Sequence, residues 1–131
     1  MTLKVALVVP DRELWAGEAR MVIAKTTEGD IGVLSGHSPM FGILAEGSLV
    51  EILPPEDSDG PTLVAAVSGG FLSVTTDQVS VLAAQAEVAG DVDVSVARQA
   101  LEEAPAGPTT GEESGEAKYA RALLRAAGDQ A

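Results

Sequence analysis

The chain changes character near residue 90, and this change does most to limit what it can fold into. Residues 1–89 hold short apolar segments rich in β-branched residues, separated by glycine, proline and aspartate. Short segments at near-regular spacing are typical of an antiparallel sandwich or barrel. No helical pattern interrupts them, which argues against a parallel sheet with crossover helices. The sequence therefore predicts a mainly β fold with an α appendage, its sandwich domain spanning 1–89.

Aromatic residues make up only 3% of the chain, so this sandwich needs a core of aliphatic side chains. The expected strands cover 3–9, 18–26, 31–34, 40–44, 48–53, 63–67, 71–75 and 78–83. Successive side chains on a strand point to opposite faces, so one face of each segment is expected to be buried. We expect most of the core to come from Met21, Ile23, Val33, Leu34, Val50, Ile52, Val67, Phe71, Val79 and Val81.

Residues 91–131 are rich in alanine, glutamate and arginine, and their apolar residues recur at helical spacing. We expect a first helix that Pro105 stops, because proline cannot continue a helix. A Pro/Gly linker over 105–115 follows, and then a second helix over 116–127 that Gly128 ends. This half is therefore predicted to be a two-helix segment.

The second expected helix carries a basic stripe, formed by Lys118, Arg121 and Arg125, in a chain of net charge −12. Short alanine-rich helices are not stable alone in water, so both must pack on the sandwich, on each other or on a partner. Two interpretations stay open: a structural lid over one sheet, or a switch that changes its docking. As a switch, the helix would use the same charges in both positions, and we expect the undocked position to depend on them more.

The composition excludes several classes of function. There is no cysteine and one histidine, which rules out disulfides, thiol catalysis and a multi-His metal centre. The net charge of −12 leaves no basic footprint for nucleic acid. No apolar run approaches the roughly 20 residues of a membrane span, and none suits a secretory signal. Composition therefore predicts a soluble cytoplasmic protein without a metal or cofactor.

Candidate catalytic chemistry is sparse. His37 lies in a short turn, where its neighbours Ser35 and Ser38 cannot readily face it as nucleophiles. Glu28 and Asp30 flank a glycine, a pattern more typical of a solvated loop than of a metal site. These residues favour a binding or coupling module over an enzyme. A stand-alone domain that binds a small ligand or senses a nucleotide remains an alternative, as does a sandwich hydrolase that uses His37.

Two blocks of the sequence resemble a known family. Residues 27–39 read TEGDIGVLSGHSP and residues 66–74 read AVSGGFLSV. In this order and spacing, and followed by two helices, they resemble the epsilon subunits of F-type ATP synthases. The resemblance implies a ten-stranded β-sandwich followed by a C-terminal helix-loop-helix. It also implies a non-catalytic subunit of the central rotor stalk, which couples c-ring rotation to ATP synthesis and whose helices inhibit ATP hydrolysis.

The resemblance implies the residues that meet the rotor partners. Those assigned to contact with the c-ring or the gamma subunit are Glu28, Gly29, Asp30, Ile31, Gly32, Gly36 and His37. Ser35 stands where the family has proline, which makes this turn less rigid. The implied partners are gamma, the c-ring and, transiently, the catalytic alpha/beta head. The implied location is the cytoplasmic side of the cell membrane, as a peripheral protein that does not insert into it.

The resemblance also assigns roles to the C-terminal helices. Lys118, Arg121 and Arg125 are implied to act in regulation, and Arg98, Arg121 and Arg125 are the positions that could contact ATP. Ser95 and Gln99 replace the aspartate and the alanine of the family's ATP motif, so half of it is missing. The sequence therefore predicts a weak ATP contact at most, and no cofactor.

Overall fold

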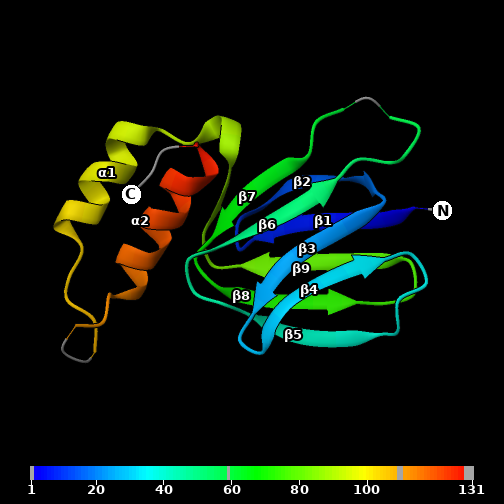
Figure 1. Ribbon diagram of the computed structural model, residues 1–131, viewed down its shortest axis with the longest axis horizontal. Helices are drawn as coiled ribbons and strands as arrows, with labels where there is room; N and C mark the ends of the chain where they lie inside the picture. Colours follow the sequence, from blue (N-terminus) through cyan, green and yellow to red (C-terminus); the bar gives the residue numbers. More distant parts are fainter. Residues whose placement is uncertain (1, 59, 109–110, 129–131) are drawn as a thin grey trace.

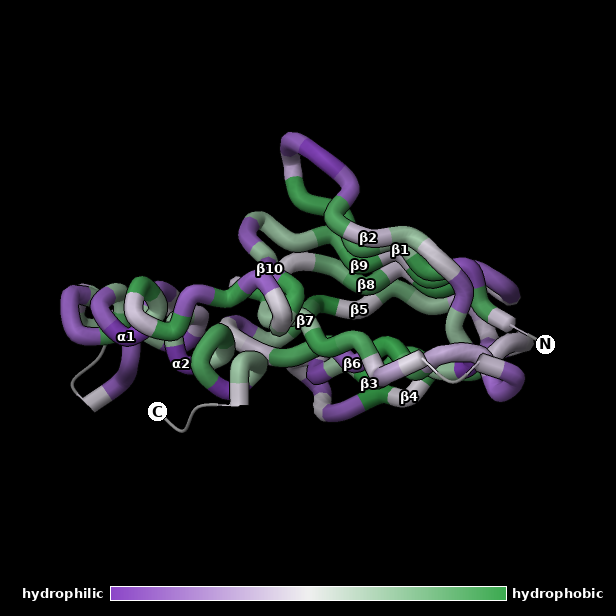
Figure 2. The backbone as a smooth tube through the Cα atoms, turned by 90° about the horizontal axis from the view of Figure 1, so that it is seen from above, coloured by the Kyte–Doolittle hydropathy of each residue, from purple (hydrophilic) through white to green (hydrophobic). Residues whose placement is uncertain are grey.

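A computed structural model describes residues 2–58, 60–108 and 111–128. Over these residues the chain forms two facing layers of strands, ten strands in all, with two α-helices at one end (Figures 1 and 2). The predicted sandwich and C-terminal helix pair are therefore confirmed. Residues 109–110 of the predicted linker and 129–131 of the predicted two-helix segment lie outside the described residues.

The strands pair in two runs that meet at one corner. The first run, in spatial order, is β10 (Ala86–Val88), β7 (Leu63–Val67), β6 (Ser48–Leu53), β3 (Met21–Thr26) and β4 (Gly29–Leu34). The second is β5 (Met40–Leu44), β8 (Gly70–Val74), β9 (Gln78–Ala83), β1 (Leu3–Val9) and β2 (Arg12–Ala19). The two runs join where Thr26 of β3 pairs with Leu44 of β5.

The pairing departs from the sequence prediction in three places. Most pairs are antiparallel as expected, but β1 lies parallel to β9. Strand β2 was not expected, because its sequence RELWAGEA holds no β-branched residue, and the three-residue β10 was too short to recognise. The strand expected over 18–26 is instead the end of β2 and all of β3, separated at Arg20.

An aliphatic core fills the space between the layers. Of the predicted core, Val33, Val50, Ile52, Val67, Val79 and Val81 are buried, and Met21 and Ile23 are half-buried. The prediction was wrong for Leu34 and Phe71, which are 55% and 47% exposed. In β8 the inward positions belong to Leu72 and Val74, so the alternation places Phe71 on the outer face.

The helices begin and end where local chemistry dictates. Helix α1 (Val94–Glu103), preceded by a 3₁₀ turn η1 (Ala89–Asp91), is capped by Asp93, whose carboxylate accepts a hydrogen bond from the Val96 amide at 3.2 Å. It stops before Pro105, as predicted. Helix α2 (Gly115–Ala126) is capped by Ser114 and followed by Gly128 at φ +84°.

A second, smaller apolar cluster joins the helices to the sandwich. Its buried members are Ala66, Ala97, Ala122, Leu123 and Leu124. Ala66 belongs to β7, so α2 rests on the end of the β6–β7 layer, and α1 packs against α2 (Figure 1). The helices thus occupy a docked position on the sandwich.

Candidate functional site

The outer surface of the β5-β8-β9 layer carries an exposed apolar face. We use this name for Phe41, Ile43, Phe71 and Leu82, which are between 40% and 65% exposed. Ile43, Phe71 and Leu82 lie side by side in the strand register, one from each of the three strands. The rings of Phe41 and Phe71 stack with centroids 5.3 Å apart. Contiguous exposed hydrophobic side chains of this kind mark interaction surfaces, because their contact with water is unfavourable and a partner can remove it.

Sequence reasoning missed this apolar face because it assigned Phe71 to the core. The available signal was the pair Phe71 and Leu72, since adjacent strand residues cannot both point inward. The residue that points inward is the one on the same face of the strand as Val74. Which face of β8 meets the core is set by its pairing with β5 and β9.

The turn between β3 and β4 presents the predicted acidic residues to solvent. The Thr26 hydroxyl donates to the Gly29 carbonyl at 2.8 Å and accepts from the Glu28 amide at 3.2 Å, which fixes the turn. Gly29 has φ +125°, a conformation that favours glycine. Glu28 and Asp30 are exposed, and Ile31 packs against the core and anchors the loop. The structure thus places the residues from 28 to 32 together as an exposed, rigid, acidic turn.

Gly36 and His37 form a separate turn next to the strand that ends at Leu34. The Gly36 amide donates to the Thr76 carbonyl at 2.9 Å, and the His37 amide donates to the Leu34 carbonyl at 3.1 Å. His37 Nδ1 lies 2.7 Å from the Ser38 carbonyl oxygen, which can only accept a hydrogen bond. Within the described residues no hydroxyl is bonded to this ring, so His37 has no nucleophile to activate.

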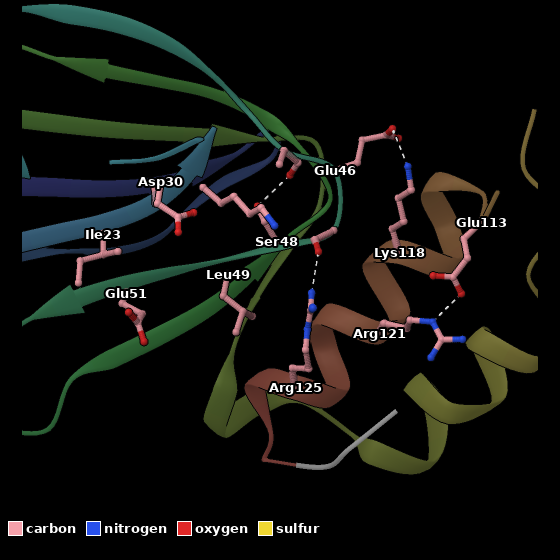
Figure 3. Close-up of a pocket in the computed structure, with 14 residues that line it drawn as sticks. Ile23, Asp30, Glu46, Ser48, Leu49, Glu51, Glu113, Lys118, Arg121 and Arg125 are labelled. Atoms are coloured by element: carbon pink, nitrogen blue, oxygen red, sulfur yellow. Dashed lines mark hydrogen bonds and ion pairs between the residues drawn. The ribbon is translucent and has the colours of Figure 1, made fainter. Parts of the chain in front are cut away.

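Two of the three residues of the predicted basic stripe contact the sandwich. Figure 3 shows Lys118 and Arg125 reaching the β5–β6 turn and Arg121 turned toward Glu113. Lys118 Nζ lies 3.8 Å from Glu46 Oε1, and Arg125 Nη2 donates to the Gly47 carbonyl at 3.0 Å. The Arg121 guanidinium pairs with Glu113, which lies in the linker before α2. The three cations are therefore engaged within the chain in the docked position.

A cleft of about 490 Å³ lies between the β5–β6 turn and α2, and the predicted ATP positions fit it poorly. Arg121 and Arg125 line it, whereas Arg98 lies on α1 and does not. The acidic residues in its lining are Asp30, Glu46, Glu51 and Glu113. Four basic residues line it as well, so the formal charges of the lining balance; they are Lys25, Lys118, Arg121 and Arg125. The docked position therefore brings only two of the three predicted ATP positions to this cleft.

Tyr119 lies in the contact between α2 and the sandwich. Its ring packs against the apolar cluster that joins helices and sandwich. Burial, together with the nearby charge of Glu87 on β10, raises the pKa of Tyr119 to about 12. The docked position thus holds this phenol in its neutral form.

Among the described residues, no group of three or more histidine, aspartate or glutamate side chains is arranged to hold a metal ion. Neither helix in the described part of the chain has the length and apolar character needed to cross a membrane.

Comparison with known proteins identifies the family. Residues 2–89 match the model of the ATP synthase delta/epsilon chain β-sandwich domain. The ATP synthase epsilon chain of Nocardia farcinica is 50% identical over 104 residues, which cover 79% of this chain and 78% of that one. The epsilon chain of Thermobifida fusca is 54% identical over 103 residues, covering 78% and 74%. The chain belongs to the ATP synthase epsilon chain family.

Solved structures support the same fold. A chain of the Euglena gracilis mitochondrial ATP synthase aligns with a TM-score of 0.70 at 24% identity, over 97% of this chain and 79% of that one. A chain from the central stalk and c-ring of the Tetrahymena thermophila mitochondrial enzyme aligns with a TM-score of 0.56 at 15% identity, over 97% and 91%. These similarities include the helices, which lie beyond the residues that the family model matches.

Family membership decides between the functions that the sequence left open. Epsilon chains are non-catalytic subunits of the central stalk of F-type ATP synthase, so the prediction of a stalk subunit is confirmed. The stand-alone ligand-binding domain and the His37 hydrolase are set aside. The site residues predicted for individual contacts stay predictions.

Proposed function

We propose that this chain couples rotation of the c-ring to the catalytic head by binding the gamma subunit through its apolar face. The observation that carries the proposal is the stacked pair of Phe41 and Phe71 on the outer surface of the second strand run. Covering these exposed apolar side chains with a partner lowers the free energy, because it removes apolar surface from water. The rest of that layer packs on the core, so the face offers a rigid platform for transmitting torque.

The acidic β3–β4 turn is proposed as the second contact, with the polar loops of the c-ring. Glu28 and Asp30 are exposed at its tip, and the hydrogen bonds of Thr26 hold the tip in one conformation. Carboxylates in this position suit a basic or hydrogen-bonding partner loop. Gly36 and His37 are proposed to lie near the same partners. Through these contacts the chain would sit at the cytoplasmic side of the cell membrane as a peripheral subunit.

The helices are proposed to restrain ATP hydrolysis. They are short, three of the five buried residues in their apolar cluster are alanines, and a few polar contacts add to their docking. Elements with small buried apolar area are the ones that detach at low cost. In an extended position the helices would reach the alpha/beta head transiently and block the hydrolytic direction.

Assembly with gamma tests the main proposal. Phe41→Ser together with Phe71→Ser should reduce the amount of gamma that copurifies with the chain at least about tenfold, because the substitutions remove the centre of the interface. Val96→Ser is the matched control, since Val96 is 62% exposed on α1 and lies outside the apolar face. Circular dichroism checks that both variants fold. Normal gamma binding by the folded double variant would contradict the proposal.

A further inference from the structure

The turn between β5 and β6 makes an unusually close contact with α2. We call residues 45–47 the docking turn. Gly47 is buried, with φ +60°, and a Cβ atom at this position would overlap the backbone carbonyl of Lys118 and lie 2.6 Å from the Lys118 Cβ. The obstacle is helix backbone, which cannot rotate away as a long side chain can. Helix α2 therefore rests directly on the bare backbone of Gly47.

Polar contacts close around this point from both sides. Arg125 Nη2 donates to the Gly47 carbonyl at 3.0 Å, and Lys118 Nζ lies 3.8 Å from the carboxylate of Glu46 (Figure 3). Lys118 Nζ lies equally close, at 3.8 Å, to Glu112 of the linker, so its charge is shared between the two carboxylates. Lys118 and Arg125 are seven residues apart, so they contact the docking turn from two successive turns of the helix. A Cβ at Gly115 would meet Glu46 at 2.6 Å, so the start of α2 also lies against this turn.

The apolar part of the same contact is small. Three of its five buried members are alanines, Ala66, Ala97 and Ala122, and the other two are Leu123 and Leu124. An alanine side chain buries far less apolar area than a leucine or valine, and the docking of α2 gains correspondingly little from it. The docking turn therefore adds contacts that this modest apolar cluster does not provide.

The docking turn is also held independently of the helices. The Gly47 amide donates to the Ser68 carbonyl at 3.2 Å, and the Ser48 hydroxyl donates to the Ala45 carbonyl at 2.8 Å. These bonds belong to the sandwich and remain when α2 leaves. A change at Gly47 can thus displace the helix without unfolding the strands.

We propose that the docking turn holds the helix pair on the sandwich, and we call this contact the catch. Gly47 leaves the space that the Lys118 backbone occupies, and the polar contacts of Lys118 and Arg125, which we call the clamp, add to it. The chain would release α1 and α2 when this one contact is disturbed. The sequence alone suggested that the stripe matters more for the undocked position, and the contacts of Arg125 and Lys118 argue that it stabilises the docked one. The effect of release on hydrolysis, and only that step, rests on the proposed function.

Hydrogen exchange on the full chain tests the catch. Gly47→Ala should speed exchange of the α2 amides at least about tenfold, because alanine must push the helix away and is itself strained at this φ. The amides of β6 and β7 should keep their protection. Gly111→Ala is the matched control, because Gly111 has φ +85° with nothing within 4 Å of its Cβ position, so it carries the backbone strain without the contact. Unchanged α2 exchange in Gly47→Ala would overturn the proposal, and so would an equal loss of protection in β6 and β7.

A second pair of variants tests the polar clamp. Lys118→Ala with Arg125→Ala should also speed α2 exchange, whereas Lys4→Ala with Arg12→Ala removes the same charge from exposed positions on β1 and β2 and should leave it unchanged. Equal exchange in the two double variants would remove the clamp from the proposal.

The assembled complex separates the catch from the regulatory function. If release leads to inhibition, Gly47→Ala should lower ATP hydrolysis several-fold relative to Gly111→Ala. Faster α2 exchange without any change in hydrolysis would refute the proposed regulation and leave the catch standing. Slow exchange together with altered hydrolysis would refute the catch.

Discussion

Ionisation of Tyr119 should lower the stability of the folded chain as the pH is raised. Tyr119 is the single tyrosine of the chain. Burial, with the charge of Glu87, raises its pKa from 10.0 to about 12. Forming the phenolate places a charge in the half-buried contact between α2 and the sandwich, and the docked position opposes this.

The sign of the effect follows from the raised pKa. The folded chain keeps the phenol protonated to a higher pH than the unfolded chain, so the stabilising contribution is complete below pH 10.0. It is lost as the pH rises through the folded pKa of about 12. A shift of about two units corresponds to about 2.7 kcal/mol, and solvent screening of a half-buried ring reduces this to about 1–2 kcal/mol.

The measurement combines a tyrosinate absorbance titration with denaturant unfolding at about pH 9 and about pH 11. Tyr119→Phe keeps the packed ring and removes the ionisation, so its free energy of unfolding should fall less between these two pH values. Because the Phe variant keeps every other titratable group of the chain, the difference between the two chains isolates the phenol. A tyrosinate midpoint near 10 in the native chain, or equal losses of stability in both chains, would refute the reasoning.

Other predictions concern the sandwich and the acidic turn. Leu72→Ala, at a fully buried position, should lower the free energy of unfolding by about 2–5 kcal/mol, whereas Phe71→Ala, at 47% exposure, should lower it by less than about 1.5 kcal/mol. Thermal or denaturant unfolding compares the two, and a larger loss for Phe71 would contradict the assignment of this ring to the surface. Asp30→Ala should weaken assembly only slightly, since one exposed ion pair contributes about 0–1 kcal/mol. Deleting residues 28–32 should uncouple ATP hydrolysis from proton pumping, and full coupling in the deletion would remove this turn from the c-ring contact.

The features that were predictable from sequence depend on local chemistry. Pro105 stops α1, because proline lacks an amide hydrogen and its ring clashes with the preceding turn of a helix. Asp93 caps α1 by accepting a hydrogen bond from the amide of Val96, three residues later in the sequence. The alternation in β6 placed Val50 and Ile52 inward without reference to any other strand. Each of these needs only residues that are adjacent or one turn apart.

The features that sequence reasoning missed depend on contacts between distant segments. Phe71 and Leu72 are equally apolar, and only the pairing of β8 with β5 and β9 determines which one faces the core. Gly47 resembles any turn glycine in the sequence, and its importance comes from Lys118, which lies seventy-one residues later and touches it. A single sequence carries no direct signal for such contacts, so the apolar face and the docking turn emerge only from the fold.

ATP hydrolysis by the assembled complex tests most directly whether the two helices regulate it. Complexes reconstituted with the full chain and with a chain lacking residues 91–131 are compared for hydrolysis and for proton-driven synthesis. If the helices inhibit, we expect several-fold faster hydrolysis in the truncated complex, with synthesis nearly intact. Hydrolysis equal to that of the full-length complex would contradict regulation by the helices and leave them as a structural lid.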